Sequence, residues 1–225
     1  MRLETPSLAG AAYDALRRGI YDGTYAPGSF IRISQFAASL EISITPVREA
    51  MARAAAERLL VLDPNHGFTV ARKLSADEYD WLFAVRLLLE EEGVASLEDA
   101  PAVAEALQPF ADQMSSYTGG TSMDEFFEFE AADQAFHRTL VGTGNPFLLI
   151  AYDSLHFHLH VSRLYGAGGI LDAPLALGEH QAIIDALTRG DVAEARAALV
   201  AHVRGSEQRL RLLLLPPAES FGENA

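Results

Sequence analysis

Apolar residues at the start of the chain recur at helical spacing. Ala12, Leu16 and Ile20 lie four residues apart along the sequence. Gly23 follows them and is a typical helix stop. The pattern therefore predicts an amphipathic helix over residues 8–22.

Two shorter helices are predicted next. Ser34 is a candidate N-cap for a helix that ends near Leu40. Ser43 or Thr45 is a candidate N-cap for the following helix, which should run to about Arg58. A short turn separates the two helices, which is the spacing of a helix-turn-helix.

A β-hairpin is predicted directly after these helices. Apolar residues at 60–62 and 68–70 flank the turn-forming stretch 63–67, Asp-Pro-Asn-His-Gly. Residues 25–31 read as a turn that leads into a short extended piece. Three helices followed by a hairpin form a winged helix-turn-helix. In that arrangement the third helix presents its N-terminal residues to the major groove of DNA.

The remaining chain is helical in pattern. Three capping boxes mark helix starts, at Ser75/Glu78, Ser122/Glu125 and Asp191/Glu194. About six helices are predicted, over residues 75–96, 99–115, 122–141, 145–165, 172–189 and 191–215. The fold class is therefore mainly α, with a winged helix-turn-helix followed by an all-helical bundle.

The predicted domains are residues 1–74, a DNA-binding domain, and residues 75–215, a helical domain. Residues 216–225 begin with two prolines and are predicted to be a disordered tail. On the first helix of the bundle, an apolar stripe is predicted from Leu82, Val85 and Leu89 with Trp81 and Leu88 beside it. The acidic run Glu90–Glu92 is expected to be a solvated face.

Charge divides the chain in the same place. Residues 1–75 hold nine basic and seven acidic residues, a net charge of +2, whereas residues 76–225 hold eight basic and 24 acidic residues, a net charge of −16. Such asymmetry is expected when only one part of a protein meets an anion. The sequence contains no cysteine, which excludes disulfides and thiolate metal sites. With no signal-peptide pattern and no apolar run of membrane-spanning length, a soluble cytoplasmic protein is expected.

Residues 8–71 resemble the GntR family of bacterial transcription regulators. The motifs that carry the resemblance are Tyr25-x-Pro27-Gly28, Phe36-Ala37-x-x-Leu40, Ser43-x-Thr45-Pro46-Val47-Arg48-Glu49-Ala50-Met51 and Asn65-x-Gly67-Phe68-x-Val70. The resemblance implies binding to a double-stranded DNA operator through Arg32, Ser43, Thr45, Arg48, Arg53, His66 and Gly67.

Three positions depart from that family. The family usually has an arginine where this chain has Ile44, and glycines near Glu41 and Arg58. Ile44 has two interpretations, contact with a thymine methyl group or packing toward the protein interior. Arg48 also has a plainer interpretation, as a solvated helix charge beside Glu49.

Four residues in the helical part form a candidate metal site. Asp133 and His137 lie four residues apart and share a helix face. His180 lies ten residues before Gly190 and His202 twelve after it, so a chain reversal at this glycine would bring the two imidazoles level. One carboxylate and three imidazoles suit a divalent transition ion such as zinc, nickel or manganese.

This part also resembles the ligand-sensing (FCD-type) domain of the FadR branch of the GntR family. The matching segments are Asp133-Gln-Ala-Phe-His137, Glu179-His180-x-x-Ile183 and Ala201-His202. The resemblance implies that these residues hold a metal whose coordination a small organic acid effector completes.

Two further features stay open. Arg86 is either a buried partner of Glu90 or an anchor for an anionic effector. His156, His158 and His160 form either a partly exposed polar face or the lining of a pocket.

The sequence thus predicts a homodimeric transcription regulator, most simply a repressor, whose operator affinity depends on the effector. One alternative is a metal-dependent, hydrolase-like enzyme that uses the aspartate and three histidines to activate water. Against it, no separate general base has supporting spacing, and the N-terminal domain would be unexplained. The other alternative is a metal-free regulator with a structural histidine cluster.

Overall fold

The structure is a computed structural model that describes residues 7–63, 67–117, 122–142, 145–164 and 173–214, with the side chains of 156–164 and 212–214 excepted. The chain divides into two compact units at Lys73 and Leu74, and each is described by itself. The expected tail, residues 216–225, lies outside the described residues. Among the described residues, no helix combines the length and apolar character needed to cross a membrane.

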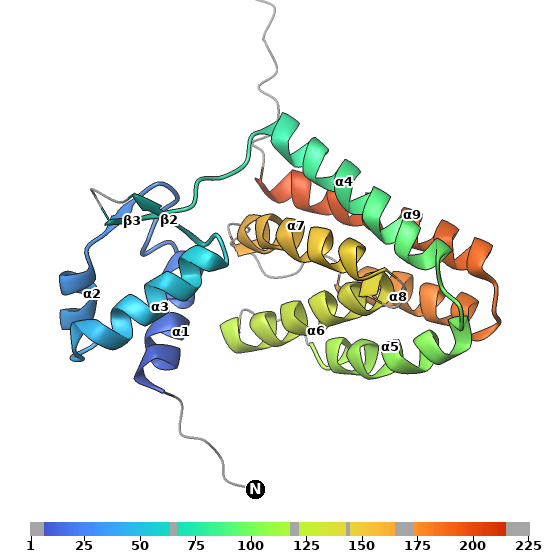
Figure 1. Ribbon diagram of the computed structural model, residues 1–225, viewed down its shortest axis with the longest axis horizontal. Coiled ribbons are helices and arrows are strands. Elements are labelled where there is room, and N and C mark those ends of the chain that lie inside the picture. Colours follow the sequence, from blue (N-terminus) through green and yellow to red (C-terminus); the bar gives the residue numbers. More distant parts are fainter. Residues whose placement is uncertain (1–6, 64–66, 118–121, 143–144, 165–172, 215–225) are drawn as a thin grey trace, which may run out of the picture. The chain divides into compact units, whose positions relative to one another are not determined.

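The first unit has the helices and hairpin that the sequence predicts (Figure 1). Its elements are α1 (Leu8–Tyr21), β1 (Phe30–Ile31), α2 (Ile33–Ser39), α3 (Ile44–Ala56), β2 (Leu60–Asp63) and β3 (Gly67–Val70). Ser7 caps α1 by accepting a hydrogen bond from the Gly10 N–H at 3.0 Å. The apolar faces of α1 and α3 are buried against each other through residues that include Leu16 and Met51.

A three-stranded antiparallel sheet follows the helices, in the order β1-β3-β2. The hairpin of β2 and β3 is confirmed, with Leu60 paired with Val70 and Asp63 with Gly67. The pairing of β1 with β3 was not predicted, because a strand of two residues leaves almost no periodic signal in the sequence. Gly67 has a φ of 100°, which favours glycine at the start of β3.

The starts and ends of α2 and α3 differ from the prediction. Ser34 is not an N-cap, because β1 leads directly into α2 and Arg32 occupies the N-cap position. Ser43, not Thr45, is the N-cap of α3, although its side chain makes no capping hydrogen bond. Helix α3 ends at Ala56 instead of Arg58, since Arg58 has a φ of 55°.

Among the residues that the structure describes, two non-glycine residues have a positive φ, Glu41 and Arg58, both at 55°. These are the positions where the resemblance led us to expect glycine. An L-residue in this left-handed conformation carries a steric cost of roughly 1–2 kcal/mol, which glycine avoids. Both turns therefore adopt a conformation that favours glycine, with a larger residue in its place.

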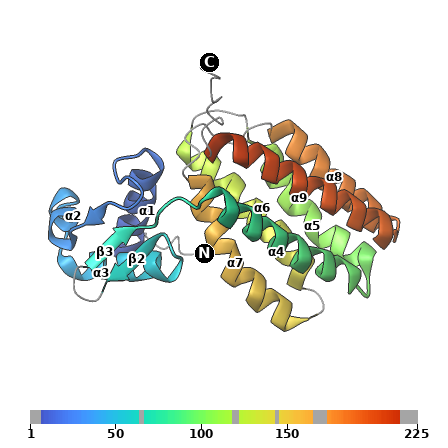
Figure 2. The ribbon, with the colours of Figure 1, turned by 90° about the horizontal axis from the view of Figure 1, so that it is seen from above.

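The described part of the second unit is a bundle of six helices, as predicted (Figure 2). These are α4 (Ala76–Ala95), α5 (Ala100–Ser115), α6 (Met123–Gly142), α7 (Pro146–Leu164), α8 (Ala173–Thr188) and α9 (Val192–Leu214). Helix α5 packs on α6 and α8, while α4 packs on α6 and α9. Helices α8 and α9 lie side by side, joined at Gly190, whose φ of 72° allows the chain to reverse.

The predicted capping box of α4 is present in full: Ser75 accepts from the Glu78 N–H at 3.2 Å, and Glu78 accepts from the Ser75 N–H at 2.9 Å. Ser122 and Asp191 likewise accept hydrogen bonds from the N–H groups three residues further on, at 3.4 and 2.9 Å. These local sequence signals therefore mark helix starts correctly.

The apolar stripe predicted on α4 is only partly right. Leu82 is buried, but Trp81 and Leu88 are 65% and 69% exposed, and Val85 is also exposed. The buried face of α4 instead carries a charged pair, Arg86 and Glu90, among its apolar residues. Counting apolar residues alone therefore pointed to a face turned partly away from the core.

Candidate metal centre and DNA-reading helix

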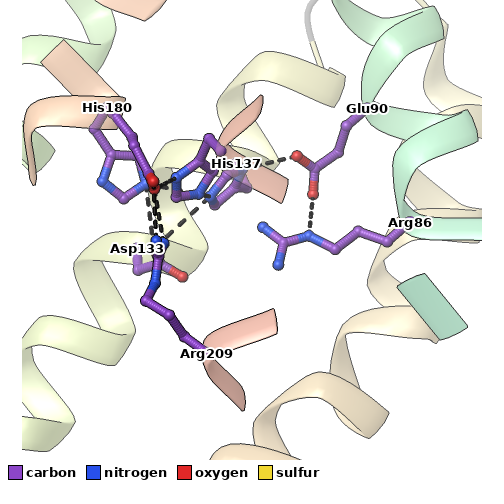
Figure 3. A network of polar contacts seen from close by, with 8 residues as sticks. Arg86, Glu90, Asp133, His137, His180 and Arg209 are labelled. Carbon is purple, nitrogen blue, oxygen red and sulfur yellow. Dashed lines mark hydrogen bonds and ion pairs between the residues drawn. The ribbon is translucent and has the colours of Figure 1, made fainter. Parts of the chain in front are cut away.

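Four side chains from three helices converge in the second unit (Figure 3). Asp133 and His137 come from α6, His180 from α8 and His202 from α9. All four are buried, and one ligand atom from each lies within 4.8 Å of the others. The reversal at Gly190 brings the last two histidines together, as the spacing predicted.

The same ring nitrogen of each histidine faces the centre of this cluster. His137 Nε2 lies 3.3 Å from His180 Nε2 and 3.2 Å from His202 Nε2. His180 Nε2 in turn lies 3.3 Å from the Asp133 carboxylate. Three Nε2 atoms and one carboxylate oxygen thus surround a common point, which is the arrangement of ligands about an ion.

In two of the histidines, the ring nitrogen that faces away from the centre contacts a carboxylate. His137 Nδ1 lies 2.9 Å from Glu90 Oε2, and His202 Nδ1 lies 2.9 Å from Glu179 Oε2. When a carboxylate accepts the Nδ1–H, the Nε2 lone pair is left for a metal, and such partners are usual behind metal-ligating histidines. The structure therefore supplies a reason for the inward orientation of two of the three rings.

Arg86 completes the contact behind His137. Its Nε donates to Glu90 Oε1 at 2.6 Å, and both side chains are buried (Figure 3). Of the two interpretations of Arg86, the geometry bears out the partner of Glu90. The expectation that Glu90 lies on a solvated face is wrong, because Glu90 is 0% exposed. Its spacing of four residues from Arg86 was the available signal, but the same spacing is common on exposed helix faces.

The cluster favours the protonation states that a metal requires. Burial lowers the pKa of His180, and burial with the neighbouring imidazole charge lowers the pKa of His202 to about 3. Burial by itself would raise the pKa of Glu90, but the charge of Arg86 and the contact with His137 hold it well below its usual value. At neutral pH the imidazoles of His180 and His202 are therefore neutral, and the Glu90 carboxylate is ionised.

The residues fit a divalent transition ion. Three imidazole nitrogens and one carboxylate oxygen are donors that zinc, nickel and manganese accept. The side chains of His156, His158 and His160 lie outside the described residues, so the two interpretations of that cluster stay as they were.

In the first unit, the start of α3 faces outward. Ile44 is 44% exposed, and Ser43, Thr45 and Arg48 are exposed as well. Of the two interpretations of Ile44, inward packing is wrong. Arg32 is exposed at the N-cap of α2, and Gly67 begins β3, whereas His66 lies outside the described residues.

Arg53 has contacts within the protein. Its Nε donates to Glu57 at 2.9 Å, and its guanidinium lies 3.8 Å from the centre of the Tyr13 ring. The Tyr13 hydroxyl also donates to Glu57. The hydrogen bond from Tyr13 and the cation–π contact join α1 to the end of α3. Contact of Arg53 with DNA stays a prediction.

Relatives of known description share both units. One is described as a "Probable D-xylose utilization operon transcriptional repressor" of Paenarthrobacter nicotinovorans; it is 31% identical over 208 residues, covering 90% of this chain and 88% of that protein. Another is the "Uncharacterized HTH-type transcriptional regulator YdhC" of Bacillus subtilis (strain 168), which is 28% identical over 207 residues, covering 90% of each.

Solved structures show the same fold. E. coli McbR/YncC superposes with a TM-score of 0.67 at 22% identity, covering 92% of this chain and 98% of that chain. Lar, described as controlling expression of the Listeria monocytogenes agr system, superposes with a TM-score of 0.63 at 17% identity, covering 94% of this chain and 100% of that chain.

Two family models match the chain, one for each unit. Residues 8–70 match the model described as "Bacterial regulatory proteins, gntR family", and residues 81–205 match the FCD domain. The second match alone covers more than half of the 225 residues. The resemblance seen in the sequence is thus confirmed: this chain belongs to the GntR family of bacterial transcription regulators, with a C-terminal FCD domain.

Proposed function

We propose that this regulator is a cytoplasmic repressor whose operator affinity is set by a small carboxylate bound at a metal ion in the FCD domain. DNA-binding regulation follows from the family. The proposal that a metal and an effector control operator affinity rests on one observation, the buried convergence of Asp133, His137, His180 and His202. Zinc, nickel or manganese held there would offer open coordination positions to a carboxylate oxygen.

Charge around the centre supports an anionic effector. Arg86 is 1% exposed, and its positive charge contributes to the lowered pKa of both His180 and His202. A positive charge that acts on the imidazoles across a low-dielectric interior also favours an anion brought to the same place. Arg86 thus contributes to effector binding by its charge, while its Nε remains on Glu90.

The start of α3 is the proposed DNA-reading element. Arg48 and Thr45 lie on its exposed face, and Ser43 is at its N-cap. In a winged helix-turn-helix this end of the third helix enters the major groove. The further proposed DNA contacts are Arg32 at the start of α2, His66 and Gly67 in the wing, and Arg53 at the side of α3.

The protein is proposed to act as a homodimer on an operator with two half-sites. Trp81, Val85 and Leu88 form an exposed apolar stripe on α4, and contiguous exposed apolar residues are typical of a surface that binds another protein. Trp81→Glu should then shift the protein from dimer to monomer in sedimentation velocity. A dimer of unchanged stability in the variant would exclude this stripe as the contact.

A hydrolase-like activity has little support from the site. The carboxylates behind the cluster, Glu90 and Glu179, are each bonded to an imidazole and to an arginine. Neither is therefore placed to act as a general base toward a water molecule.

The decisive experiment measures DNA affinity against metal and effector. Fluorescence anisotropy would follow binding to labelled DNA from the region flanking the protein's own gene, at low salt, where phosphate contacts are strongest. Metal-loaded protein and chelator-treated protein would each be titrated with a panel of small carboxylates. We expect at least one carboxylate to change the DNA affinity of the metal-loaded protein only. An effector has this influence when it binds the DNA-bound and DNA-free forms of the regulator with unequal affinity. DNA binding that never responds to metal or carboxylate would leave a metal-free regulator as the remaining interpretation.

A further inference from the structure

Glu179 lies beside the cluster without belonging to it. It is on α8, directly before His180, and its Oε2 lies 2.9 Å from His202 Nδ1. Arg209 on α9 donates to both of its oxygens, at 2.9 Å to Oε1 and 2.7 Å to Oε2. A guanidinium that holds both oxygens of a carboxylate fixes the plane of that group as well as its position.

Gly205 makes room for this ion pair. It lies in the interior of α9, between His202 and Arg209. A Cβ at this position would be 3.0 Å from both Arg209 Nη1 and Glu179 Oε1, which is closer than ordinary van der Waals contact. Glycine disfavours a helix interior, so its presence here needs a reason. The close approach of the ion pair to the α9 backbone supplies that reason.

The same pattern occurs at a second histidine of the cluster. Arg86 holds Glu90, and Glu90 contacts His137 Nδ1, as Arg209 holds Glu179, and Glu179 contacts His202 Nδ1. His180 differs, because its buried Nδ1 has no hydrogen-bond partner among the described residues. Two of the three rings therefore have an arginine-held carboxylate at Nδ1, and the third has none among the described residues.

We propose that Glu179, held by Arg209 across Gly205, is a positioning residue that turns the Nε2 atom of His202 toward the metal. The inference rests on the proposed metal centre. Helix α8 carries His180 and Glu179, and α9 carries His202 and Arg209. The two helices thus supply two ligands and also the ion pair that orients one of them, so loading of the metal depends on how α8 and α9 lie against each other.

Metal affinity tests this role with the whole chain. Glu179→Ala should weaken Co²⁺ binding roughly 10–100-fold in competition with a chromogenic chelator, the usual loss when a partner behind a ligand is removed. Glu179→Gln keeps an acceptor for the Nδ1–H and should restore part of the affinity. Arg209→Met and Gly205→Ala should each cause a smaller loss, because the carboxylate remains but is no longer fixed.

Arg211→Met is the matched control. Arg211 is also on α9 and also pairs with a carboxylate, Asp80 of α4, but this pair is exposed, unlike the four buried ligands. Its removal should leave Co²⁺ affinity within about twofold, since exposed ion pairs contribute little.

A second measurement separates positioning from simple packing. In metal-free protein, ¹⁵N NMR of the imidazoles should find the His202 proton on Nδ1 in the wild type, and on both nitrogens in exchange in Glu179→Ala. A residue that only packs would change the free energy of unfolding and leave this tautomer as it is. Wild-type affinity and an unchanged tautomer in Glu179→Ala would overturn the inference while the metal centre stands. A wild-type protein that takes up no metal would instead overturn the proposed function, and the tautomer would still decide whether Glu179 orients the ring.

Discussion

Gly93→Ala should destabilise the FCD domain, although alanine is the better helix former. Gly93 is buried in α4 where that helix crosses α6. A Cβ built there lies 2.8 Å from Val141 Cα and 3.0 Å from the Leu140 carbonyl oxygen. Both are backbone atoms, so no side-chain rotation relieves the contact, and α4 must move away from α6. Glu90 lies one turn earlier and reaches His137 across the same interface at 2.9 Å.

The magnitude follows from two opposing effects. Replacing glycine by alanine within a helix favours folding by about 1 kcal/mol. Overpacking a close interface costs about 1–3 kcal/mol. Gly178→Ala provides the matched control, because Gly178 is exposed in α8 with nothing within 4 Å of an added Cβ. The two variants should therefore differ by about 1–3 kcal/mol, with Gly178→Ala the more stable.

Urea unfolding followed by circular dichroism measures this difference. The slope with denaturant should stay the same in both variants, so that the midpoint reports stability. Gly93→Ala should also bind Co²⁺ more weakly, because the separation of α4 from α6 draws Glu90 away from His137. If Gly93→Ala gains as much stability as Gly178→Ala, the close packing of α4 on α6 and the argument built on it are wrong.

Three further predictions concern DNA binding, backbone strain and pH. Arg48→Ala should weaken operator binding and reduce the slope of log K against log salt concentration by about 1. Ile44→Arg should instead tighten operator binding and steepen that slope. An unchanged affinity for Ile44→Arg would mean that this side chain faces away from the duplex. Glu41→Gly should raise the free energy of unfolding by about 1 kcal/mol, because it relieves a positive φ of 55°, and a loss of stability would contradict that reason. In metal-free protein, the pKa of His202 is about 3 in the folded state and about 6.5 in the unfolded state. Its contribution to the free energy of unfolding is therefore complete above pH 6.5 and is lost as the pH falls toward 3. The free energy of unfolding should be about 2 kcal/mol lower at pH 5 than at pH 7, and this difference should be smaller in His202→Leu. An equal pH dependence in the two proteins would contradict the lowered pKa of His202.

Much of the fold could be predicted because its signals are local. The capping box at Ser75 and Glu78, the reversal at Gly190 and the spacing of Asp133 and His137 each depend on residues close together in the sequence. The convergence of His180 and His202 needs only two antiparallel helices joined at a known glycine. Such features follow from helix geometry without knowledge of the packing.

The features that were missed depend on distant parts of the chain. Glu90 meets His137 across 47 positions, and Glu179 meets Arg209 across 30. A buried carboxylate and an exposed one look alike in a sequence, because only the opposing helix decides which of them loses water. Trp81 shows the converse error, because the apolar pattern predicts that it is buried in the core, whereas it lies on the surface. A pattern of polar and apolar residues therefore locates helix faces well only where charged residues stay outside.

The metal content of the purified protein tests the central claim most directly. Wild-type protein and Asp133→Ala, prepared without chelators and then offered zinc, nickel and manganese, would be analysed by mass spectrometry of the bound metal after gel filtration. We predict close to one ion per chain in the wild type and almost none in Asp133→Ala, with both variants folded by circular dichroism. A folded wild-type protein that retains none of the three ions would contradict the claim that this buried cluster is a metal centre.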